Sequence, residues 1–156
     1  MSHMDQRGIE GLPLKLLIVA LLLSISFPSV WQTLIYYDST VIIEEATSNA
    51  LEIKGCAVSA FIGGEGNIRT LHVRMRPSMA SGEPAIEIGG SPNSASARVI
   101  SIVSGIGPIC TIPLDDPAIE MCTWDGKTIR LEAGESDLVF KAVQSAGSLL
   151  IMVRAG

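Results

Sequence analysis

The sequence contains little charge: only 17% of its 156 residues are Asp, Glu, Lys or Arg, and the formal net charge is −5. It has no run of Lys or Arg, because Arg69, Arg74, Arg76 and Arg98 are scattered among apolar residues. A nucleic-acid partner needs a positive stripe that faces the phosphates. The sequence therefore argues against nucleic-acid binding, and its hydrophobic content of 47% excludes a disordered chain.

Residues that carry catalysis or bind metals are also scarce. The only histidines are His3 and His72, and the motifs G-x-S-x-G, H-E-x-x-H and C-x-x-C are absent. A structural zinc site needs four ligands at close spacing, and Asp115-Asp116 offers too few oxygens for a calcium loop. We expect no enzymatic activity, no metal and no cofactor, with His72 as a solvent-facing strand residue.

Three cysteines are present: Cys56, Cys110 and Cys122. In an oxidising compartment, Cys110 and Cys122 could form a disulfide that closes a short loop. Two buried thiols are the alternative. Cys56 would then be left as a small packed residue.

The hydrophobic excess is concentrated near the N-terminus. From Leu16 to Trp31 the chain reads LLIVALLLSISFPSVW, without a charge, and apolar residues on both sides extend this segment beyond the roughly twenty needed to cross a bilayer. Lys15 at one edge can extend its ammonium toward headgroups, and Tyr36 and Tyr37 on the far side suit the interface. The segment predicts a membrane anchor, with Pro28 expected to kink or loosen the helix.

Two alternatives to a retained anchor exist. A buried core helix would need more surrounding protein than a chain of this size offers. A conventional secretory signal has a shorter apolar core and a small-x-small cleavage site, which Ser24-Ile25-Ser26 and Ser29 approximate poorly. Retention of the helix is therefore the favoured interpretation.

The residues before the apolar segment are more specific. Asp5-Gln6-Arg7-Gly8-Ile9-Glu10 places a basic residue, a glycine, an apolar residue and a carboxylate directly before it. This pattern resembles the class III (prepilin-type) signal peptide of archaeal type IV pilins and archaellins. The resemblance implies that a prepilin peptidase removes residues 1–8 by cutting between Gly8 and Ile9, so that the helix stays with the mature protein. Gly11 and Leu12 form a second candidate cleavage site, and Glu10 is a candidate for pairing with a neighbouring subunit.

Helical periodicity continues past the apolar segment and predicts one helix over residues 9–62. Its second half is amphipathic, with an apolar stripe at intervals of three, four and seven formed by Ile35, Ile42, Ala46, Ala50, Ile53, Ala57 and Phe61. Glu44, Glu45, Ser48 and Asn49 occupy other faces. The sequence Gly63-Gly64-Glu65-Gly66-Asn67 predicts the end of the helix, since no lysine or second helix follows as a phosphate-binding loop requires.

Residues 67–156 predict an all-β domain. Thr70 to Arg76 alternates, with Leu71, Val73 and Met75 facing inward. Further short strands are expected over residues 85–88, 98–103, 108–112, 121–124, 127–131, 138–143 and 149–153. Asp125-Gly126 predicts a tight hairpin between two of these strands. The expected fold class is thus α+β: a long helix, membrane-spanning in its first half, followed by a small antiparallel sandwich-like domain.

These features favour a structural role over catalysis. The leading hypothesis is a subunit of an archaeal type IV pilus-like filament that self-associates, or associates with other pilin-like subunits, through its apolar helix. Its β domain would be extracellular. The alternative is an anchored surface binding or accessory protein with the same two parts that does not polymerise.

Overall fold

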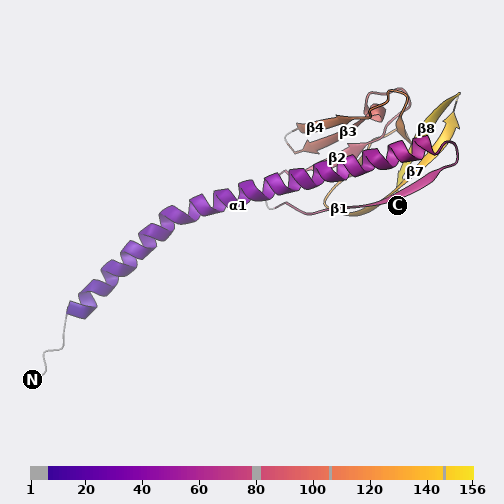
Figure 1. The fold of residues 1–156 in the computed structure, drawn as a ribbon. Coiled ribbons are helices and arrows are strands. Elements are labelled where there is room, and N and C mark those ends of the chain that lie inside the picture. Colours follow the sequence, from indigo (N-terminus) through magenta and orange to yellow (C-terminus); the bar gives the residue numbers. More distant parts are fainter. Residues whose placement is uncertain (1–6, 79–81, 106, 146) are drawn as a thin grey trace, which may run out of the picture. The chain divides into compact units, whose positions relative to one another are not determined.

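A computed structural model describes residues 7–78, 82–105, 107–145 and 147–156, with side chains described from Pro13 onward. The chain forms two compact units, Met1–Tyr37 and Asp38–Gly156. One helix, α1 (Arg7–Ile62), contributes to both (Figure 1). A long helix followed by a small, mostly antiparallel, two-sheet β domain confirms the predicted α+β class.

The β domain consists of two four-stranded sheets. In the first, the strand order is β1-β7-β8-β5, and in the second it is β4-β3-β2-β6. Every neighbouring pair is antiparallel except β5 and β8, which are parallel. The strands and the 3-10 helix that the structure describes are β1 (Ile68–Met75), β2 (Ala85–Ile88), η1 (Ser96–Arg98), β3 (Val99–Ser104), β4 (Gly107–Pro113), β5 (Met121–Thr123), β6 (Ile129–Leu131), β7 (Gly134–Ser145) and β8 (Ser148–Ala155).

One face of α1 completes the core of this domain. Spacings of four and three residues place five fully buried side chains on that face: Ala46, Ala50, Ile53, Ala57 and Ala60. They belong to one hydrophobic cluster with residues of both sheets, among them Ile86, Ile102, Leu138 and Phe140. Four of the five are alanines, whose small side chains let the helix backbone approach the strands closely. The predicted apolar stripe is confirmed from Ile42 to Ala57.

Polar residues of α1 bind the free edge of β1. The Asn49 side-chain amide donates to the Arg74 carbonyl (2.9 Å), and the Arg76 backbone N–H donates to Glu45 Oε1 (3.3 Å). The Arg76 guanidinium also contacts Glu45 Oε2 at 2.6 Å. An uncovered edge strand is a template for pairing with another chain. These contacts therefore cover the C-terminal end of that edge, a role that the sequence pattern did not indicate for Glu45 or Asn49.

The helix ends at Ile62, as the glycine cluster predicts. The Asn67 side-chain amide turns back and donates to the last carbonyls of α1, those of Ser59 (3.3 Å) and Ala60 (3.4 Å). A Cβ on Gly63 would lie 1.8 Å from Asn67 Nδ2, so only glycine permits this close approach. The cap satisfies carbonyl groups that a helix end leaves without an internal partner.

The predicted hairpin between β5 and β6 is wrong. Gly126 has the expected positive φ (70°), and its N–H donates to the Thr123 carbonyl (3.2 Å). However, β5 pairs with β8 in the first sheet, whereas β6 pairs with β2 in the second. The Asp-Gly turn thus carries the chain from one sheet to the other. All three β5 residues are buried.

Candidate functional site

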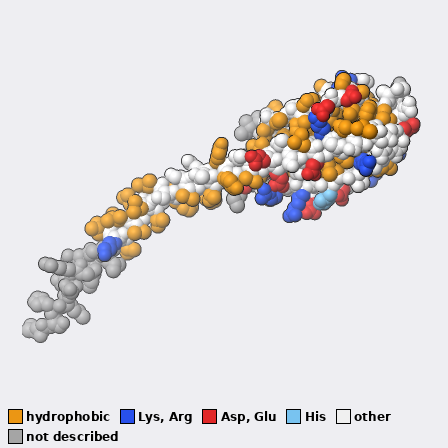
Figure 2. All heavy atoms as spheres, viewed as in Figure 1, with side chains coloured by type: hydrophobic (Ala, Val, Ile, Leu, Met, Phe, Trp, Pro, Cys, Tyr) orange, Lys and Arg blue, Asp and Glu red, His pale blue; other side chains and the backbone are white. Residues whose placement is uncertain are grey.

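The most distinctive surface is the apolar part of α1. Between Leu14 and Trp31, the large hydrophobic side chains are 49–68% exposed and point in all directions around the helix. An 18-residue window of α1 reaches a mean hydropathy of 2.0, and none of it is buried. In Figure 2 this part carries hydrophobic side chains, whereas the charged groups gather mostly over the β domain. By length and composition, α1 contains a candidate membrane-spanning segment.

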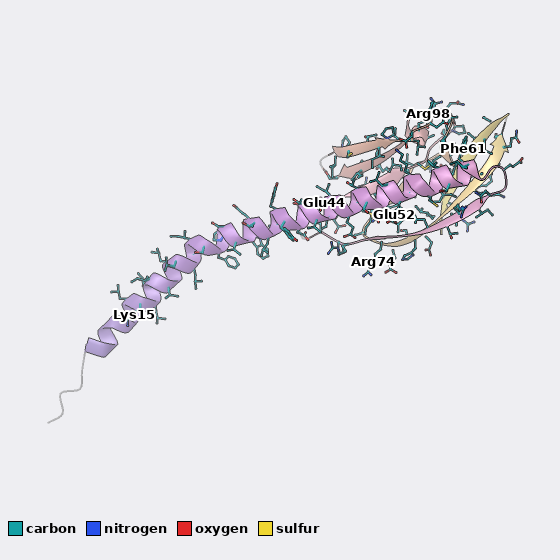
Figure 3. The ribbon with its side chains drawn as sticks, in the orientation of Figure 1. Lys15, Glu44, Glu52, Phe61, Arg74 and Arg98 are labelled. Atoms are coloured by element: carbon teal, nitrogen blue, oxygen red, sulfur yellow. The ribbon has the colours of Figure 1, made fainter. Side chains whose placement is uncertain are left out.

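Polar groups in this segment bond to the helix itself. The Ser24 hydroxyl donates to the Ala20 carbonyl (2.7 Å), and the Thr33 hydroxyl donates to the Ser29 carbonyl (2.9 Å). Such bonds remove the cost of placing a hydroxyl in an apolar medium. α1 continues through Pro28 without a break, although Pro28 has no N–H to offer the carbonyl four residues earlier. Lys15 lies near the start of the described side chains (Figure 3).

The leader residues are described only in part. Gly8, Ile9, Glu10, Gly11 and Leu12 have helical backbone within α1, but their side chains lie outside the described residues. Residues 1–6 lie outside them altogether. Both candidate cleavage positions and the pairing role of Glu10 therefore stay predictions.

The disulfide considered between Cys110 and Cys122 is absent from the structure, in which all three cysteines are free. Cys110 is exposed on β4 of the second sheet, whereas Cys122 is fully buried on β5 of the first, in a small cluster with Ala97 and Leu150. Burial raises the pKa of the Cys122 thiol and of the half-buried Cys56 thiol. Both are thus held in the unreactive thiol form at neutral pH.

His72 faces solvent on β1, as predicted. Its Nδ1 lies 2.7 Å from Asp137 Oδ1 on the facing residue of β7, and both side chains are more than half exposed. Two residues along, Arg74 faces Glu135 in the same way, with 3.6 Å between the charged groups. Both pairs join β1 to β7 across the outer face of the sheet. Within the described residues, no group of three His, Cys, Asp or Glu side chains could hold a metal ion.

A buried carboxylate, paired with a half-exposed arginine, holds the loop before η1 in place, and the sequence did not reveal this contact. The Glu120 side chain is only 8% exposed, and its Oε1 accepts hydrogen bonds from Arg98 Nε (2.9 Å) and Nη2 (2.6 Å). Its Oε2 accepts from the Asn93 backbone N–H (3.0 Å). Figure 3 shows Arg98 beside β3. The Asn93 hydrogen bond, with Arg98, lowers the pKa of the Glu120 carboxyl despite its burial. Spacing in the sequence gives no hint that these residues meet.

We expect Glu120→Gln to lower the free energy of unfolding of the β domain by about 1.5–3 kcal/mol at neutral pH, because it removes a charge from three hydrogen bonds. Since the pKa of the folded state lies below the ordinary value of 4.5, the carboxylate stabilises the domain above that pH. This contribution is lost as the pH falls through the lowered pKa. Urea denaturation of the detergent-solubilised chain should show that the free energies of unfolding of wild type and variant converge as the pH falls.

Glu132→Gln is the matched control. Glu132 also pairs with an arginine, Arg130 at 3.1 Å, but its side chain is 69% exposed. An exposed pair contributes little, so this variant should change stability by less than about 1 kcal/mol. The stabilising role of the Glu120 carboxylate would be contradicted if both variants lost the same free energy of unfolding. It would also be contradicted if the difference between wild type and Glu120→Gln persisted at acid pH.

No protein family, curated protein or solved structure matches the chain. The exposed apolar part of α1 is the feature of the chain that points most directly to a function.

Proposed function

We propose that this chain is a structural subunit of a type IV pilus-like surface filament of the archaeal kind, not an enzyme. The observation that carries the proposal is the hydrophobic surface of α1 between Leu14 and Leu34, where the large apolar side chains are about half exposed or more. In a bilayer, lipid covers such a surface. Outside a bilayer, it must be buried against other helices, and copies of the same chain supply matching ones.

The β domain supports the same role. It has its own hydrophobic core, completed by the later turns of α1, and needs no lipid to cover its strands. Before assembly, the chain would be anchored in the cell membrane with this domain outside the cell. After assembly, the apolar helices would form the filament core and the β domains its surface. Prepilin peptidase, the membrane and other copies or pilin-like subunits are the partners that this function requires.

Processing at the leader tests the proposal most directly. When the chain is co-expressed with an archaeal prepilin peptidase, mass spectrometry of the purified protein should show a mature N-terminus at Ile9. Gly8→Val should abolish processing, because a branched side chain prevents the close backbone approach that glycine allows. Gly11→Val, the matched control, should still be cut after Gly8.

The other outcomes are equally informative. Loss of processing in Gly11→Val alone would place the cleavage site between Gly11 and Leu12 and would leave the proposed function unchanged. A wild-type chain that stays intact beside an active peptidase would contradict the filament proposal and favour an anchored binding protein. A start beyond Ser26 would contradict it too, because the apolar helix would then be discarded.

A further inference from the structure

A hollow lies on the outer face of the first sheet, away from the core that contains α1. It has a volume of about 500 Å³, within the usual range for small-molecule sites. Its floor is apolar and consists of Val143, Leu150 and Met152 from β7 and β8. Trp124, Asp125 and Ser145 line it with exposed side chains.

Trp124 is the feature that needs an explanation. The chain has only two tryptophans, and the other, Trp31, belongs to the apolar segment of α1. The side chain of Trp124 is 71% exposed although it follows the fully buried strand β5. An indole left in water contributes nothing to the core, whereas indole rings at binding surfaces offer a flat apolar face together with an N–H donor.

The turn that carries Trp124 is held in place by hydrogen bonds on both sides. The Thr123 N–H donates to the Gly90 carbonyl (3.1 Å), and the Ser91 hydroxyl donates to the Gly126 carbonyl (3.1 Å). The Lys127 N–H donates to Asp125 Oδ1 (3.1 Å). That last bond also lowers the pKa of the Asp125 carboxyl, which is therefore ionised at neutral pH. A turn held in this way, with its carboxylate already oriented, loses little entropy when a ligand binds.

We propose that this hollow binds a pyranose sugar, with one face of the ring stacked on Trp124 and hydroxyl groups donating to the Asp125 carboxylate. A pyranose presents C–H groups on its faces and hydroxyls around its rim. Those two surfaces match an exposed indole, an apolar floor and a polar border of Asp125 and Ser145. The inference goes beyond the filament function and holds whether or not the chain polymerises.

The indole N–H signals give a direct test. The full chain, labelled with ¹⁵N-tryptophan and kept in a detergent without a sugar headgroup, should give two indole signals, which Trp31→Phe assigns. Titration with glucose, galactose, mannose and N-acetylglucosamine, and with their β-1,4-linked disaccharides, should shift the Trp124 signal in a saturable way. The Trp31 signal should stay unchanged.

Two variants separate the contribution of stacking on Trp124 from that of the Asp125 charge. Asp125→Asn keeps the acceptor for the Lys127 N–H, so the turn is retained, but it should weaken sugar binding about tenfold because a charge-assisted hydrogen bond is lost. Trp124→Ala should abolish retention on the corresponding immobilised sugar. Ile68→Ala, which removes another exposed apolar side chain outside the hollow, should leave binding unchanged.

Three results would overturn the proposal. The first is the absence of any shift of the Trp124 signal with every sugar of the panel. The second is a shift that depends on protein concentration alone, which would assign the hollow to a second copy of the chain. The third is a shift with a lysine- or arginine-rich peptide but with no sugar, which would assign it to a cationic partner.

Discussion

Leu22→Arg is expected to reduce the yield of sheared filaments at least tenfold while the chain remains in the membrane. Leu22 lies in the middle of the apolar segment and is 57% exposed. One arginine at the centre of a membrane helix costs about 2.5–3.5 kcal/mol on insertion scales, which the many remaining apolar residues offset. In a filament core, by contrast, the same charge would be buried in every copy and would have no partner.

Ser48→Arg is the control for that experiment. Ser48 is exposed on α1 beside the β domain, outside the apolar segment, so its replacement should leave the filament yield close to that of wild type. The quantity of mature protein in the membrane fraction and its N-terminus should be measured for both variants. Normal filaments from Leu22→Arg would show that the apolar surface is not an assembly surface. That result would favour the anchored binding protein.

Phe140→Ala is expected to lower the free energy of unfolding of the β domain by about 3–5 kcal/mol. Among the described residues, Phe140 is the largest fully buried side chain, and it belongs to the cluster that joins both sheets to α1. Its truncation removes apolar burial and leaves a cavity, because neighbouring side chains can collapse only in part. Urea denaturation of the detergent-solubilised chain, followed by circular dichroism of the β domain, measures the loss.

Val139→Ala provides the comparison within the same strand. Val139 is adjacent to Phe140 on β7, points to the opposite face of the sheet and is only half-buried. Its truncation should cost about 1 kcal/mol or less. If Phe140→Ala also lowered the free energy of unfolding by only about 1 kcal/mol or less, the core would not be packed as the structure shows.

Features that depend on neighbouring residues were predicted well from the sequence. The apolar stripe of α1, the helix end at Ile62 and the alternation of Leu71, Val73 and Met75 follow from local periodicity and turn residues. Each expected strand also has a counterpart among β1 to β8. Such patterns reflect burial of one face of an element, and the sequence records that burial directly.

Features that depend on which strands meet could not be predicted in the same way. Asp125-Gly126 makes the expected turn, but local chemistry does not state that β5 pairs with β8 and β6 with β2. The pair of Glu120 with Arg98 spans 22 residues, and its members look like ordinary surface charges in the sequence. Likewise, the hollow at Trp124 exists only because the turn lies beside β7 and β8. All three features depend on which strands and loops come together in the tertiary structure.

The attachment of α1 to the β domain determines how the domain bears mechanical load. Tension that reaches the domain through α1 acts along the helix axis, and the buried face from Ala46 to Ala60 runs along that axis. Lys54 is held to Asp115, Glu45 to Arg76, and Asn67 closes the far end of the helix. These contacts are loaded in shear together instead of being peeled apart in sequence. Pulling on the helix would therefore load the interface between α1 and both sheets along its whole length.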